Sequence, residues 1–177
     1  HQPMLDRALL RCPEASFSLQ DMCDFSVQQP LDLITCFLYS IHYSAHLQRL
    51  QACFANVHSA LTEGGLFCFN AVDKNKIDNA LWVTHSAQHS DGLFRFSSGW
   101  AYAGTGEQQF LQLRIEKTSL GETQHWYDQH SMVAVSFSQL LELLQPYFEV
   151  QVLEHDYQAI RPWDSRSGNA IFVCVKI

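Results

Sequence analysis

Apolar residues recur at helical spacing in three parts of the chain. The first, Met4–Arg11, ends two residues before a proline, which stops its continuation. The longest, His46–Leu61, carries a single apolar stripe through which we expect it to pack. The third follows Ser136, where Gln139 completes a capping box, and ends before Pro146. These patterns predict three helices.

Nearly continuous apolar runs at Leu31–Phe37 and Leu66–Val72 are typical of strands covered on both faces. The long helix lies between them, and we expect Gly64–Gly65 to end it in the left-handed conformation. Strand, helix and strand form a βαβ unit, whose right-handed crossover predicts two parallel neighbouring strands. Shorter runs predict further strands at Ser16–Leu19, Phe148–Leu153 and Ala170–Ile177.

The pattern changes after Asp73. Three β-prone segments, near 92–102, 107–118 and 122–135, are separated by glycine-containing turns and predict antiparallel hairpins. We therefore expect one domain over residues 1–177, with an antiparallel β insert at 83–135 that serves as a lid or as a dimer face.

Composition narrows the function. The 177 residues are 47% apolar, enough for one buried core, and the net charge of −7 lacks the basic surface that nucleic acid requires. The longest apolar run, Leu31–Ile41, is too short to span a membrane. Six cysteines without a C-x-x-C spacing favour a reducing cytoplasm. Neither a nucleic-acid nor a membrane partner is expected.

Three segments carry a resemblance. They are Asp21-Met22-Cys23-Asp24-Phe25, Ser40-Ile41-His42-Tyr43 and His125-Trp126-Tyr127-Asp128-Gln129-His130. With the order of elements, they resemble the class I S-adenosylmethionine-dependent methyltransferases, in particular the small-molecule N-methyltransferases that dimethylate amino sugars in macrolide pathways. The resemblance covers nearly the whole chain. It implies an α/β fold with a Rossmann-like methyltransferase sheet, S-adenosylmethionine as cofactor and a small-molecule substrate.

The opening of that family's pattern is missing. No glycine precedes Gly64, and the single G-x-G, at Gly104 and Gly106, opens no helix and suits a hairpin tip. His1 stands where an initiator methionine is expected. We therefore expect a sheet truncated at its N-terminal β-α-β unit. Its unpaired edge predicts association, for which we favour a homodimer.

The resemblance also implies a cofactor site. Asp21 would accept a hydrogen bond from the adenine amine, while the backbone N–H of Met22 would meet a ring nitrogen. Cys36, Phe37 and Leu38, at the end of the next strand, would line the methionine and sulfonium region. Two alternatives stay open: Asp21 as a turn or helix-capping residue, and Phe37 as part of the core.

An amine acceptor must arrive neutral, which requires a nearby base. His42 and His130 are the candidate catalytic residues, because the imidazole pKa lies near neutral pH. A loop histidine and a solvated strand face are the alternatives. The candidate residues for binding the acceptor are Ser40, Tyr43, Asn70 and Trp126, although Asn70 also suits a loop cap.

Other chemistries find little support. The pairs His42/His46 and His85/His89 have helical ligand spacing but no matching third ligand, so no metal site is expected. No G-x-S-x-G motif indicates a hydrolase. The sequence thus favours a methyltransferase acting on a small molecule, at nitrogen. The alternative is a catalytically inactive methyltransferase-like fragment that acts as a dimeric or small-ligand-binding protein.

Overall fold

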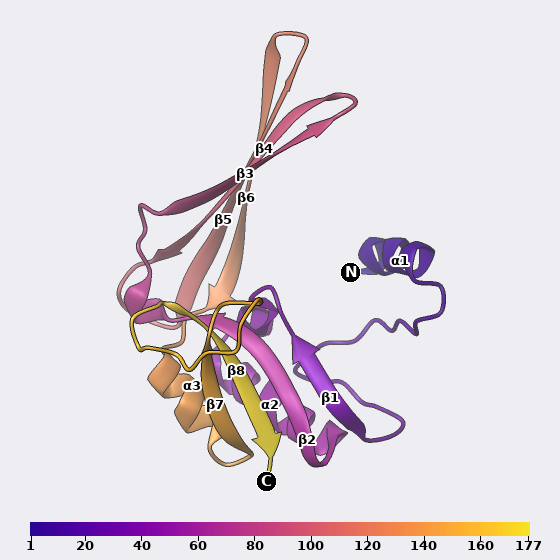
Figure 1. Ribbon diagram of the computed structural model, residues 1–177, viewed down its shortest axis with the longest axis vertical. Coiled ribbons are helices and arrows are strands. Elements are labelled where there is room, and N and C mark those ends of the chain that lie inside the picture. The colour runs from indigo at the N-terminus through magenta and orange to yellow at the C-terminus, as the bar shows by residue number, and fades with distance from the viewer.

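The computed structural model describes residues 1–177 and contains two four-stranded sheets (Figure 1). The core sheet has the order β1-β2-β8-β7 and the insert sheet the order β3-β4-β5-β6. The elements are α1 (Gln2–Arg11), β1 (Leu31–Cys36), η1 (Ser40–Ser44), α2 (Leu47–Ala60), β2 (Leu61–Val72), η2 (Lys74–Lys76), β3 (Trp82–His89), β4 (Gly92–Tyr102), β5 (Gln108–Ser119), β6 (Glu122–Val133), α3 (Phe137–Leu144), β7 (Phe148–Glu154) and β8 (Asn169–Lys176). No helix is long and apolar enough to cross a membrane.

The core sheet is mixed. β1 and β2 are parallel, as predicted, and β8 runs antiparallel to both β2 and β7. The carboxyl ends of β1, β2 and β7 consequently meet at one edge. Figure 1 views the sheet from its open face, with α2 and α3 behind it. The insert sheet rises from the edge where these carboxyl ends meet.

A cluster of 19 buried residues joins the sheet to α2 and α3. Alternate residues of β2, Phe67 and Phe69, point toward the helices, and their rings stack with centroids 4.9 Å apart. Phe172 of β8 stacks on Phe69 at the same separation. The capping box predicted for α3 is present, with Ser136 and Gln139 satisfying each other's backbone N–H groups.

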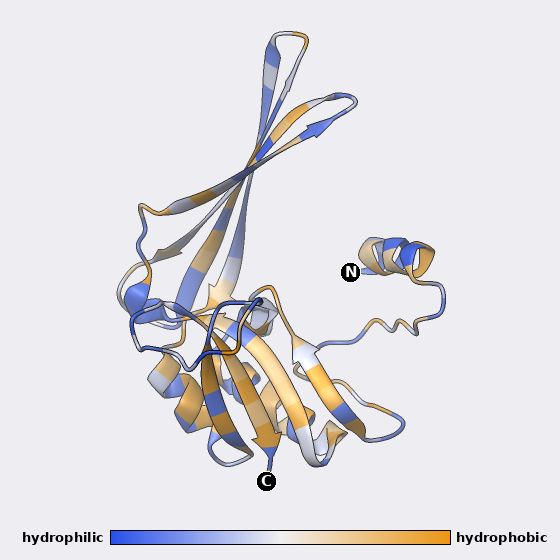
Figure 2. Ribbon diagram, viewed as in Figure 1, coloured by the Kyte–Doolittle hydropathy of each residue, from blue (hydrophilic) through white to orange (hydrophobic).

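The insert sheet has no helix on either face. Its four strands pair antiparallel in sequence order, from the tip hairpins down to the base, where β6 meets η1. Figure 2 shows the difference in side-chain character: apolar residues dominate β2 and β8, whereas they alternate with hydrophilic ones along the insert strands. This alternation gives the insert one apolar and one polar face.

Three local predictions were wrong. Ser16–Leu19 forms no strand, because no neighbouring strand supplies its backbone hydrogen bonds. Gly64–Gly65 do not end α2; the helix stops at Ala60, β2 begins at Leu61, and Gly64 (φ +72°) lies in β2 where its register against β1 shifts. The insert contains a further strand, β3, that pairs with β4.

Candidate functional site

The loop after β1 lies where the two sheets meet. Leu38 and Tyr39 are consecutive non-glycine residues in the left-handed region, with φ of 56° and 59°. Such backbone strain persists only where surrounding contacts hold it, and it is concentrated at functional sites. Phe37 and Leu38 are exposed at this edge, and Ser40 begins η1. Two of the predicted donor-binding residues, Phe37 and Leu38, therefore lie on a constrained loop.

Asn70, at the carboxyl end of β2, holds this loop. It is 1% exposed, and its Oδ1 accepts a hydrogen bond from the backbone N–H of Tyr39 at 3.0 Å. Its Nδ2 donates to His155 Nε2 at 3.3 Å, which makes that nitrogen an acceptor. Burial lowers the pKa of His155, favouring this neutral form. Asn70 thus links the loops that follow β1 and β7.

Aromatic rings surround the same loop. Trp100 of β4 contacts the rings of both Tyr39 and His42, with centroids 5.4 and 5.6 Å away. Tyr157 meets Phe37 edge to face at 6.0 Å. Sequence reasoning singled out neither Trp100 nor Tyr157, nor His155. The signal for His155 is its position two residues after a predicted strand, where α/β sheets present ligand-binding residues.

A hydrogen-bonded chain of three side chains crosses from η1 to the insert. Tyr43 Oη bonds to His130 Nδ1, and His130 Nε2 lies 3.1 Å from Asp128 Oδ2. The bond with His130 lowers the pKa of Asp128, so this carboxyl stays ionised. Burial, together with the negative charge of Asp128, raises the pKa of Tyr43 and keeps its hydroxyl protonated. Two predicted site residues, Tyr43 and His130, are brought together here.

His42 has a different environment. It is completely buried, its Nε2 accepts from the backbone N–H of Val72 at 3.1 Å, and its Nδ1 lies 3.0 Å from the carbonyl oxygen of Val133. Desolvation lowers its pKa to about 4. The neutral His42 ring forms hydrogen bonds through both of its nitrogens and so connects η1 to the ends of β2 and β6.

Asp21 lies beside the first turn of α2, the helix that follows the carboxyl end of β1. Its Oδ1 accepts from the backbone N–H of Cys23 at 2.8 Å, and its Oδ2 pairs with Arg49 at 2.5 Å. The Cys23 bond, followed by the charge of Arg49, lowers the pKa of Asp21. The side chain is still 54% exposed, and a carboxylate has about four acceptor positions. Asp21 therefore keeps acceptor positions open for a further hydrogen-bond donor while it holds the turn to Cys23.

The two remaining cofactor predictions are partly buried. Met22 and Cys36 both pack against the core cluster, and burial raises the pKa of the Cys36 thiol to about 11. Cys36 is accordingly a neutral, apolar neighbour of the loop. Trp126 is 47% exposed and lies on the same face of the insert as His130. No group of three or more metal-ligating side chains is present.

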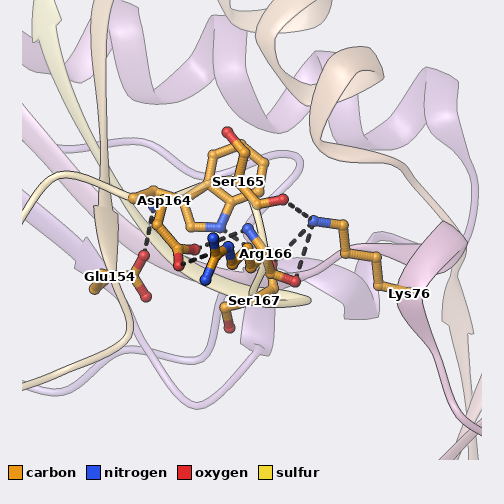
Figure 3. A network of polar contacts seen from close by, with 7 residues as sticks. Lys76, Glu154, Asp164, Ser165, Arg166 and Ser167 are labelled. Carbon is orange, nitrogen blue, oxygen red and sulfur yellow. Dashed lines mark hydrogen bonds and ion pairs between the residues drawn. The ribbon is translucent and has the colours of Figure 1, made fainter.

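The loop between β7 and β8 is held in place by polar contacts with Lys76 and Glu154 (Figure 3). Lys76 Nζ donates to the carbonyl oxygens of Ser165, Arg166 and Ser167, and lies 4.9 Å from the centroid of Trp163. On the opposite side of the loop, the backbone N–H of Asp164 donates to Glu154. The segment that carries His155 and Tyr157 is thus anchored at its far end.

The comparisons with known proteins concern the fold. No family model and no curated protein matches the sequence, but solved structures match the fold. The fold is that of S-adenosylmethionine-dependent methyltransferases, matched over the whole chain. One such enzyme, from Clostridium acetobutylicum, superposes with a TM-score of 0.77 at 17% identity, covering 100% of this chain and 72% of that one.

Two further neighbours act on sugars. CalS10, an amino pentose methyltransferase from Micromonospora echinaspora solved with S-adenosylmethionine bound, has a TM-score of 0.82 at 14% identity and covers 100% of this chain and 71% of that one. The sugar N-methyltransferase KedS8 from a Streptoalloteichus species has a TM-score of 0.68 at 17% identity, covering 89% and 60%. The chain therefore resembles small-molecule N-methyltransferases in fold and spans about seven-tenths of the first two neighbours.

Proposed function

We propose that the chain transfers a methyl group from S-adenosylmethionine to the nitrogen of a small-molecule amine. The observation that carries the proposal is the hydrogen-bonded chain Tyr43–His130–Asp128, which lies at the edge where the carboxyl ends of the core strands meet the insert. Ligands of open α/β sheets bind at this edge. The solved neighbours that act on amino sugars support the acceptor class.

The segments that precede and follow β1 would hold the donor. Asp21 and the Met22 backbone would bind adenine, and Phe37 and Leu38 would flank the donor on the strained loop, with Cys36 beneath. S-adenosylmethionine, when bound, supplies an electrophilic methyl group on a positively charged sulfur. The chain's own contribution is to orient the donor, because orientation accounts for much of the rate of a bimolecular transfer.

The Tyr43–His130–Asp128 chain would remove the proton that blocks the acceptor. An ammonium has no free lone pair, so it must lose a proton before it attacks. The Tyr43 oxygen takes this proton while its own hydroxyl proton passes to His130 Nδ1. The imidazolium that results lies beside the Asp128 carboxylate, which stabilises it. Asn70 acts indirectly, by holding the Tyr39 backbone.

A pair of histidine substitutions tests the proposal. His130→Gln removes the proton acceptor, whereas His125→Gln changes a histidine of the same strand that instead pairs with Glu116 at 3.4 Å. With glucosamine and octylamine as acceptors, we expect His130→Gln to lower kcat by about 10²-fold or more, the usual contribution of a general base. Raising the pH above the pKa of the acceptor should restore activity to His130→Gln, because the amine then arrives neutral.

Two outcomes would count against this mechanism. Equal losses in His130→Gln and His125→Gln would indicate a structural role, as would a loss that high pH does not relieve. Binding of S-adenosylhomocysteine, measured on the same variants, should stay within twofold of the unsubstituted chain. Amine binding without any methyl transfer would favour the alternative function, a small-ligand-binding protein.

We also propose a homodimer. β1 is an edge strand, so one side of its backbone lacks a strand partner, and Leu31 and Leu33 are exposed on it. Unpaired N–H and C=O groups along an edge favour pairing with another chain. Light scattering should give twice the mass of the chain at micromolar concentration. A soluble monomer at that concentration would contradict this part of the proposal.

A further inference from the structure

The apolar face of the insert sheet holds a groove of about 520 Å³. Its walls are Phe94 and Phe96 of β4, Leu113 and Ile115 of β5, and Trp126 of β6, with Asp128 at one end. The register explains why they share a face: Phe96 pairs with Ile115, and Ile115 with Trp126, so these side chains stand in a row across three strands.

The groove leads directly to the proposed proton acceptor. Along β6, the residues on this face are Trp126, Asp128 and His130, from the tip toward the core. Asp128 therefore contacts both the groove and His130. Asp128 is aligned through β5 with Ser98 of β4, and Phe94 lies four residues from Ser98 toward the tip of the insert. Four residues of a strand span about 13 Å.

Charge distinguishes the two ends of the groove. Asp128 is the one charged residue among its lining, and its carboxylate is ionised because its pKa is lowered. A cation is attracted to that end, whereas a phosphate or carboxylate is repelled. The other lining side chains are apolar, so burying an apolar group against them is favourable.

We propose that this groove binds the body of the methyl acceptor, and that the acceptor is an amphipathic amine: an apolar or aromatic body about 13 Å long with its amine at the Asp128 end. The inference rests on the proposed function, since it places the amine next to His130. The volume lies within the range of small-molecule sites, and the single charged group of the lining complements an amine.

A series of alkylamines tests the proposal without any catalysis. The full chain is titrated calorimetrically with butylamine, hexylamine and octylamine, and with octanol and octanoate as matched ligands. We expect affinity to rise about two- to fourfold for each added methylene group, as apolar burial requires. Octylamine should bind at least tenfold more tightly than octanoate, and Asp128→Asn should remove that difference.

Two tryptophans provide a matched pair of substitutions. Trp126 lines the groove, whereas Trp82 lies on the opposite face of the same sheet, where Arg114 stands over its ring. Trp126→Ser should lower octylamine affinity about tenfold, and Trp82→Ser should leave it within twofold. Phe96→Ser, on another strand of the groove, should reproduce the loss if Trp126→Ser perturbs folding.

The outcomes separate this inference from the proposed function. Alkylamine affinity that is independent of chain length, or equal for octanoate, would overturn the groove as an acceptor site. So would a dimer that Trp126→Ser dissociates, because a second copy would then cover the groove. In each case S-adenosylhomocysteine binding would still stand, whereas failure of the proposed function would abolish that binding and leave the alkylamine series intact.

Discussion

The two sheets of this chain are stabilised by different interactions. The core sheet buries aromatic rings against two helices, and Phe69 and Phe172 are completely inaccessible. The insert sheet has more strand residues, but within its strands only Gly99, Gln109, Met132 and Val133 are buried. Backbone ladders and cross-strand pairs therefore hold the insert together, whereas apolar burial holds the core.

This difference separates stability from recognition. A face that a helix covers stabilises the fold but is closed to ligands, whereas the apolar face of the insert is open. The candidate site lies at the junction, where the strained loop after β1 faces His130 at the base of β6. Substitutions in the core should therefore change unfolding, and substitutions on the insert should change binding.

The largest expected effect is in the core. Phe69→Ala removes a ring stacked between Phe67 and Phe172, and the cavity should lower the free energy of unfolding by about 3–5 kcal/mol. Phe96→Ala makes the same change in the insert, where the ring is 39% exposed. We expect it to cost less than about 1.5 kcal/mol in urea unfolding. Equal losses would contradict the distinction between the sheets.

The buried imidazole of His42 should make stability depend on pH. Its pKa falls from 6.5 in the unfolded chain to about 4 in the folded one, so above pH 6.5 neither state is protonated. As the pH drops from 6.5 to 4, the unfolded state alone gains the proton, and the folded state should lose roughly 3 kcal/mol. Urea titrations across this range measure the slope.

A substitution separates the contribution of His42 to the pH dependence of the unfolding free energy from that of the carboxyl groups. His42→Gln should abolish the His42 part of the pH dependence, whereas His85→Gln, at an exposed position of β3, should leave it intact. If both variants keep the slope of the unsubstituted chain, His42 is not the group that titrates.

A smaller effect is expected at the start of α3. Ser136→Ala removes a side chain that accepts from the backbone N–H of Gln139, and the loss of such a cap costs about 1 kcal/mol. Ser136→Asp retains an acceptor and should recover most of it. Thermal unfolding by circular dichroism measures both, and an unchanged Ser136→Ala midpoint would refute the role of the cap.

The smallest effect is expected at the tip of the insert. Lys117 pairs with Asp91 at 2.6 Å, but the Asp91 side chain is mostly exposed. Exposed pairs contribute little because water and salt screen them. Asp91→Asn should leave the urea midpoint unchanged at physiological salt. A clear loss would mean that surface pairs, and not the backbone ladder, hold the insert together.

The sequence predicted the core better than the insert. Continuous apolar runs identified β1 and β2, but the expected covering of both faces was wrong: helices pack on one face only, and Leu31, Leu33 and Leu66 are exposed. β3 was missed because Trp82–His89 mixes polar and apolar residues and is paired only through its hairpin with β4. The strand predicted at Ser16–Leu19 was wrong because β-prone residues form no strand when no neighbouring strand pairs with them.

The residues of the candidate site were predictable only in part, because Trp100, His155 and Tyr157 were not singled out, and their arrangement was not predictable. Tyr43 and His130 are 87 positions apart and meet only because the insert folds back onto η1. His42 and Tyr43 are neighbours in sequence, yet one is buried and the other faces His130, a distinction that depends on the 3₁₀ turn. Periodicity carries no information about such long-range contacts.

We propose above all that the edge joining the two sheets binds a methyl donor. Calorimetric titration of the chain with S-adenosylhomocysteine tests it most directly, with Asp21→Ala and the neighbouring Asp24→Ala as a matched pair. We expect saturable binding at one site per chain, weakened by Asp21→Ala and unaffected by Asp24→Ala. An absence of binding, or equal binding by both variants, would contradict the claim.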